Sequence, residues 1–112
     1  MKKAFLFLLT AVAVFTSNVA SAKLNPEHLE KGITILETSF LGKRTSIYSE
    51  AGDQMRDEFN KFITQASASQ DDIAADNLIR TKVGRAVQDF FYTDQQAAYK
   101  ILIEVRDQLK AE

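Results

Sequence analysis

Beyond residue 25, apolar residues recur at every third or fourth position, which is the spacing of residues along one face of an α-helix. The segment 47–66 shows this most clearly. Its apolar face runs from Tyr48 to Ala66, and its opposite face carries charged residues such as Asp53 and Lys61. Three more segments repeat the pattern, so four amphipathic helices are expected. Their predicted ranges are 26–40, 47–66, 70–91 and 94–110.

The ends of these predicted helices carry capping residues. Asn25 is a good N-cap, and Pro26 occupies the first helical position, where its missing N–H costs nothing. Gly42 is placed to end the first helix. The other three starts are predicted at Ser46 or Ser49, at Ser69 with Asp72 as a capping box, and at Thr93 with Gln96 as a second capping box.

The scarcity of turn residues argues against a β-fold. The chain has one proline and four glycines, whereas a sandwich or barrel needs turn signals every 8–12 residues or so. Helices with one apolar face must cover it, and four of them can cover one another. We therefore predict an all-α fold, a small antiparallel four-helix bundle made by residues 23–112 as one domain. The alternative is a three-helix core, with the first helix docked loosely or supplied to a dimer partner.

The first 22 residues have the features of a signal peptide. Two lysines precede an apolar run at 4–15, and Ala20-Ser21-Ala22 places small residues where a signal peptidase cuts. The run is shorter than the roughly 20 residues that span a bilayer, and no cysteine follows that could carry a lipid. We predict cleavage of Met1–Ala22 and a periplasmic or secreted bacterial protein, with no membrane span left afterwards. An uncleaved N-terminal anchor is the alternative.

Composition narrows the possible partners and cofactors. Of 14 Lys and Arg residues, Lys2 and Lys3 leave with the signal, so the mature chain carries 12 basic and 15 acidic residues, a net charge of −3. This balance argues against nucleic acid as a partner, because binding it requires a concentrated basic face. The chain has no cysteine and one histidine, which argues against disulfides, thiolate catalysis and a closed zinc site. No metal and no cofactor are predicted.

One acidic residue interrupts an apolar face. Asp72 and Asp76 are four residues apart on the side of the third predicted helix that carries Ile79 and Val83, so Asp76 falls where an apolar residue is expected. Arg80, one turn further on, is placed to form a buried ion pair with Asp76. Two alternatives remain: solvent satisfies both acids at the edge of the core, or the pair binds a divalent cation.

Other catalytic groups are scarce. The single histidine, His28, is expected as an exposed residue in the first turn of the first helix. Nucleophilic catalysis near neutral pH normally depends on a histidine base beside the nucleophile. No EF-hand loop, glycine-rich phosphate loop or nucleophile elbow occurs in the sequence. We therefore predict that the protein is not an enzyme.

An aromatic strip is the surface that the predicted core does not account for. Its residues are of the types enriched at the centres of protein interfaces. They follow the core residue Phe90 and continue along the border of the last predicted helix. The alternative is that they form the boundary layer of a small core. The strip comprises Phe91, Tyr92, Tyr99, Ile103 and Arg106.

These observations favour an exported, non-enzymatic helical protein that acts through protein–protein interaction in the bacterial envelope. Chaperones or stress factors, inhibitors or immunity proteins, and accessory parts of secretion or conjugation machines belong to this class. The expected partner is another envelope protein or a second copy of the chain. The alternative function is a membrane-perturbing or killing factor that acts from the periplasm. The net charge of −3 argues against it, because interfacial helices usually carry a cationic face.

Overall fold

The computed structural model describes residues 22–111, and every regular element within that range is helical. The predicted signal peptide lies outside the described residues except for Ala22. No helix in the described range is both long and apolar enough to cross a membrane. The four long helices are α2 (Glu27–Ile35), α3 (Glu50–Thr64), α4 (Ile73–Tyr92) and α5 (Gln95–Lys110).

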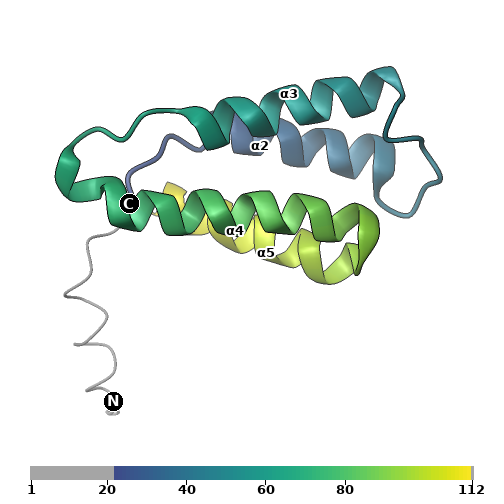
Figure 1. The fold of residues 1–112 in the computed structure, drawn as a ribbon. Coiled ribbons are helices and arrows are strands. Elements are labelled where there is room, and N and C mark those ends of the chain that lie inside the picture. The colour runs from purple at the N-terminus through teal and green to yellow at the C-terminus, as the bar shows by residue number, and fades with distance from the viewer. Residues whose placement is uncertain (1–21, 112) are drawn as a thin grey trace, which may run out of the picture.

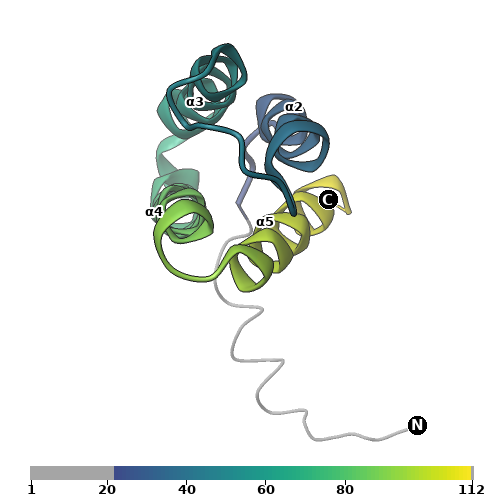
Figure 2. The same cartoon turned by 90° about the vertical axis from the view of Figure 1, so that its right-hand side faces the viewer.

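The helices form two antiparallel hairpins that lie side by side. Figure 1 shows α2 and α3 running in opposite directions above α4 and α5, and the end view of Figure 2 places the four helices at the corners of a square. Packing is more extensive within each hairpin than between them. The two hairpins meet along two seams, one between α3 and α4 and the other between α2 and α5. The all-helical prediction is confirmed.

Every helix contributes apolar side chains to one continuous core. From α2 come Leu29 and Ile33, 0% and 1% exposed, so the first helix is fully part of this core. Burial of such side chains is the main favourable term in folding, at about 25 cal/mol per Å² of apolar surface. The other largest buried side chains are Phe40, Leu36, Met55, Phe62, Val83, Leu102 and Val105.

The predicted helix ends are confirmed in part. Ser49 caps α3 by accepting from the N–H of Gly52 (3.2 Å). The start of the first helix is shifted by one residue from the prediction, because Pro26 is the N-cap and α2 begins at Glu27. The side chain of Asn25 still accepts a hydrogen bond from the backbone N–H of Glu27 (2.8 Å). Gly42 has φ +71°, a left-handed conformation that suits glycine after the end of a helix.

Two predicted capping boxes are wrong in detail. Asp94, and not Thr93, caps α5, because its carboxylate accepts from the N–H of Ala97 (3.1 Å). Ser69 donates its hydroxyl to the carboxylate of Asp72 (3.0 Å) and does not cap the backbone. A short 3-10 turn, Gln70–Asp72, precedes α4 at this point.

The first two helices depart from their predicted ranges. The last turn of the first predicted helix is a π-helix, Leu36–Phe40, in which the N–H of Leu41 bonds to the carbonyl of Leu36 (2.7 Å). The second helix begins only after Ser49. Tyr48, predicted on its inner face, therefore lies in the preceding turn and is 83% exposed.

Candidate functional site

A groove lies along the seam between the α2 side of the molecule and α5. It has a volume of about 320 Å³ and is open to solvent. Tyr99, Ile103 and Arg106 recur at spacings of four and three residues, which places them on one flank of α5, and all three are half-buried. The complete lining is Glu37, Tyr99, Lys100, Ile103, Glu104 and Arg106.

The groove is fixed by polar contacts as well as by packing. The hydroxyl of Tyr99 donates a hydrogen bond to the carboxylate of Glu37, which ties α5 to the π-turn that follows α2. This hydrogen bond raises the pKa of the Tyr99 phenol above its ordinary value, while the nearby charge of Arg106 acts in the opposite direction. Further along the same seam, Lys110 forms an ion pair with Glu30 (2.7 Å).

The structure brings only part of the predicted aromatic strip together. Phe91 does not line the groove; its ring packs edge-on against Phe40 (centroids 5.2 Å apart) and Phe90 (4.9 Å). Tyr92 is 70% exposed at the end of α4. Tyr99 and Ile103 pack their inner sides against the core, so they are boundary residues whose outer edges face the groove.

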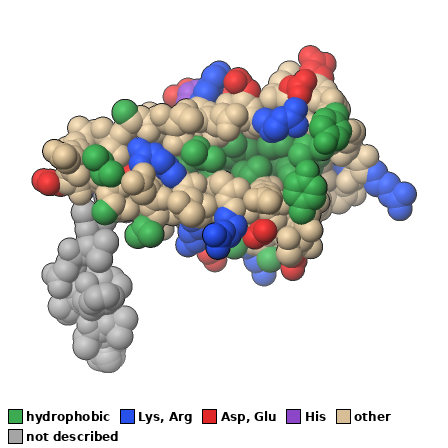
Figure 3. Space-filling model, in the orientation of Figure 1, with side chains coloured by type: hydrophobic (Ala, Val, Ile, Leu, Met, Phe, Trp, Pro, Cys, Tyr) green, Lys and Arg blue, Asp and Glu red, His purple; other side chains and the backbone are tan. Residues whose placement is uncertain are grey.

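A second apolar surface, which the sequence pattern did not indicate, lies at the other seam. Figure 3 shows hydrophobic side chains gathered between α3 and α4 on the face turned to the viewer. Ile63, Val87 and Phe91 are half-buried apolar residues of these two helices. Gly84 lies opposite Ile63, and a Cβ atom there would be 3.6 Å from Ile63 Cδ1. Gly84 has no side chain to pack on Ile63 at this point of the seam.

Asp76 and Arg80 are both held by hydrogen bonds, but not to each other. Asp76 is 0% exposed, and its Oδ1 accepts a hydrogen bond from the backbone N–H of Lys23 (2.8 Å). Arg80 donates to the carbonyl of Gln65 and to the hydroxyl of Ser67, both at 2.9 Å. The predicted ion pair does not form within the described residues, because Arg80 turns toward the end of α3 and finds its acceptors there.

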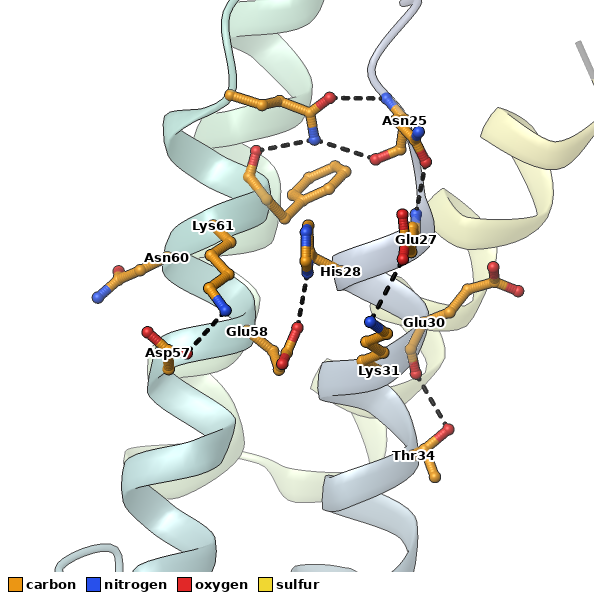
Figure 4. A network of polar contacts seen from close by, with 12 residues as sticks. Asn25, Glu27, His28, Glu30, Lys31, Thr34, Asp57, Glu58, Asn60 and Lys61 are labelled. Carbon is orange, nitrogen blue, oxygen red and sulfur yellow. Dashed lines mark hydrogen bonds and ion pairs between the residues drawn. The ribbon is translucent and has the colours of Figure 1, made fainter.

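His28 is half-buried, contrary to the expectation of an exposed residue, because it faces α3. Its Nδ1 lies 2.7 Å from Oε1 of Glu58. Figure 4 shows this pair beside the contacts of Asn25 and the exposed pair Lys61–Asp57. No group of three acidic, histidine or cysteine side chains among residues 22–111 could hold a metal ion.

The groove along α5 has apolar walls and charges of both signs on its rim. A larger and more open hollow of about 570 Å³ lies where the 66–70 connection meets Ile73 and Arg80 of α4. Comparisons with protein-family models, with curated proteins and with solved structures find no match to this chain.

Proposed function

We propose that this chain is exported from the bacterial cytoplasm, trimmed after Ala22, and binds another envelope protein through the groove along α5. The observation that carries the proposal is the juxtaposition of Tyr99, Ile103 and Arg106 on one half-buried flank beside an open hollow. Tyrosine and arginine are enriched among residues that dominate binding energy, and an apolar side chain between them supplies a dry contact.

The chemistry of the rim indicates the kind of partner. Glu37 and Glu104 contribute negative charge, whereas Lys100 and Arg106 contribute positive charge. A partner that presents an apolar side chain flanked by charges of both signs would pack the apolar group on the groove walls and pair its charges with the rim. Nucleic acid would meet the two carboxylates, which repel its phosphates. A helix lying in the groove is the recognition mode that fits this geometry best.

Burial of the apolar faces favours this function over membrane perturbation. Insertion into lipid requires the apolar face of a helix to be free. In this fold Leu29, Phe62 and Leu102 are completely buried between the helices. A membrane-active form would have to open the bundle and expose the core.

Site-specific photocrosslinking in living cells tests the proposal. A photoreactive phenylalanine analogue is placed at Ile103, in the groove, and at Val87, in the seam between α3 and α4. The matched control position is Leu78, which is 68% exposed on α4 and lies in neither surface. We expect a discrete adduct with one envelope protein from position 103 and none from position 78.

The same experiment distinguishes the competing outcomes. An adduct with the mass of two copies of the chain would replace the envelope protein by a homodimer as the occupant of the groove. Adducts from position 87 but not from 103 would show that the partner binds at the seam between α3 and α4 instead of the groove. Equal crosslinking from 103 and 78 would overturn the groove as a binding site.

A further inference from the structure

Asp76 is a buried carboxyl group with an incomplete set of hydrogen bonds. The residue is 0% exposed in the first turn of α4. Its Oδ1 accepts one hydrogen bond, from Lys23, and its Oδ2 has no partner within the described residues. Buried polar atoms are nearly always hydrogen-bonded, and an unpaired buried carboxylate is costly. Oδ2 of Asp76 therefore lacks a hydrogen-bond donor, and a positively charged donor would satisfy this buried carboxylate best.

No charged side chain of the described residues supplies that donor. Arg80, the nearest cation along α4, is engaged with the end of α3, and the side chain of Lys23 is exposed. The group that reaches Asp76 is the backbone nitrogen of Lys23, in the segment that passes the start of α4 on its way to α2 (Figure 1). Ala22 and Leu24, on either side of it, are 3% and 4% exposed.

This nitrogen belongs to the peptide bond at which the signal peptide is predicted to be cut. As an amide it carries a single N–H and no charge, so it satisfies one oxygen of Asp76. Cleavage adds one water molecule across the Ala22–Lys23 bond: the Ala22 carbonyl becomes a carboxylate on the released peptide, and the Lys23 nitrogen becomes an ammonium. An α-ammonium has three N–H donors and a positive charge, enough for both oxygens of a carboxylate.

We propose that Asp76 is the internal acceptor for the new N-terminus, so that signal-peptide removal creates a buried ion pair between the α-ammonium of Lys23 and Asp76 that locks the first segment onto α4. The inference rests on the export proposed above. Because Ala22 and Leu24 are buried in the folded chain, the peptidase must cut before this segment packs. Processing then precedes the last step of folding, and the trimmed chain is more stable than any chain with residues in front of Lys23.

Chemical labelling of the purified exported protein tests the pair directly. Lys23 carries two amines, the proposed buried α-amine and the exposed Nζ, and the second is an internal control in the same peptide. With an amine-reactive reagent and mass spectrometry, we expect the α-amine to react at least about tenfold more slowly in the folded protein than in urea. The Nζ should react at similar rates in both, and Asp76→Asn should remove much of the protection.

A thermodynamic cycle gives an independent readout. The exported chain is compared with a form in which residues 1–22 are replaced by one methionine, each with Asp76 and with Asp76→Asn. We expect the extra residue to raise the unfolding equilibrium constant roughly 100-fold or more in the presence of Asp76, the scale for breaking a buried ion pair. With Asp76→Asn, which has no charge to pair, the effect of the extra residue should be much smaller.

The failing outcomes are distinct. Equal labelling of the α-amine in folded and unfolded protein, or an equal effect of the extra residue with Asp76 and with Asp76→Asn, would overturn the ion pair alone. If Asp76→Asn does not fold, the labelling rates of the unmutated protein still decide. An intact mass with residues 1–22 attached would overturn the export proposal and the ion pair together, while leaving the groove to its own crosslinking test.

Discussion

Gly32 of α2 faces the ring of Phe59 of α3 so closely that a Cβ atom at Gly32 would lie 2.8 Å from two ring carbons. Both residues are buried, and Phe59 is 2% exposed. This absence of a side chain lets the two helices of the first hairpin approach each other. The same α2–α3 contact within the first hairpin includes the His28–Glu58 pair, which Figure 4 shows.

We expect Gly32→Ala to destabilise the protein, although alanine is the better helix former. The Phe59 ring is buried, so a Cβ atom 2.8 Å away forces it against its neighbours, and such overpacking costs about 1–3 kcal/mol. The gain from helix propensity is about 1 kcal/mol. Urea unfolding measures the difference.

Gly84→Ala is the matched control, and we expect it to stabilise the protein by about 0.5–1 kcal/mol. A Cβ atom there would make an ordinary contact with Ile63, at 3.6 Å. If both alanine variants are stabilised, the close approach of α2 and α3 at Gly32 is wrong.

Asp94→Ala should lower the free energy of unfolding by about 1 kcal/mol, because the N–H of Ala97 loses its side-chain acceptor. Thr93→Ala, one residue earlier, removes no cap and should change it much less. Thermal unfolding of the two variants side by side checks this. A larger loss of unfolding free energy from Thr93→Ala than from Asp94→Ala would instead support the capping box predicted from the sequence.

These helix starts show how far the sequence determines the fold. The apolar period is a property of each helix by itself, so the four helices, their order and the inward-facing positions of Leu29 and Leu102 follow from it. A cap depends on the backbone conformation of one or two residues, and Thr93 and Asp94 are both good candidates by type. The exposure of Tyr48 follows from the later start of α3 at Glu50, which the apolar period does not fix.

His28→Ala is expected to cost about 1 kcal/mol of folding free energy, with Glu58→Gln costing a similar amount or less. The two side chains are 32% and 19% exposed and lie 2.7 Å apart, so their contact is partly shielded from water. A double-mutant cycle, measured by urea unfolding, should give a coupling energy of about 0.5 kcal/mol or more. Additive effects of the two changes would contradict a direct contact.

The phenol of Tyr99 should titrate above the ordinary range, since its hydrogen bond to Glu37 raises its pKa. Absorbance at alkaline pH follows the three tyrosines together, and Tyr99→Phe should remove the component that ionises last. A folded-state pKa above the unfolded value means that the contribution of this group to stability is present below about pH 10 and is lost as the pH rises further. Loss of a component at ordinary pKa in Tyr99→Phe would contradict the hydrogen bond.

The candidate site follows from the sequence only in part. Tyr99, Ile103 and Arg106 share a helix, so their common face could be predicted from spacing. Phe91 belongs to another helix, and its packing against Phe40 depends on how the two hairpins meet. For Asp76 the sequence offered Arg80, one turn away, as a partner. Its observed donor is a backbone N–H 53 positions earlier in the chain. Every residue except proline has such an N–H, so the amino-acid sequence does not indicate which one reaches Asp76.

The affinity of the groove for its crosslinked partner tests the central claim most directly. The partner identified from position 103 is purified and titrated with the unmutated protein, with the double variant Tyr99→Ala and Ile103→Lys, and with Leu78→Lys as the exposed control. If the groove is the binding site, the double variant binds at least about 30-fold more weakly at a temperature where circular dichroism shows it folded, and Leu78→Lys binds normally. The thermal midpoint of the double variant should fall only modestly, because Tyr99 and Ile103 pack against the core with their inner sides alone. Unchanged affinity of the double variant, or a loss of binding that only accompanies a collapse of its stability, would contradict the account.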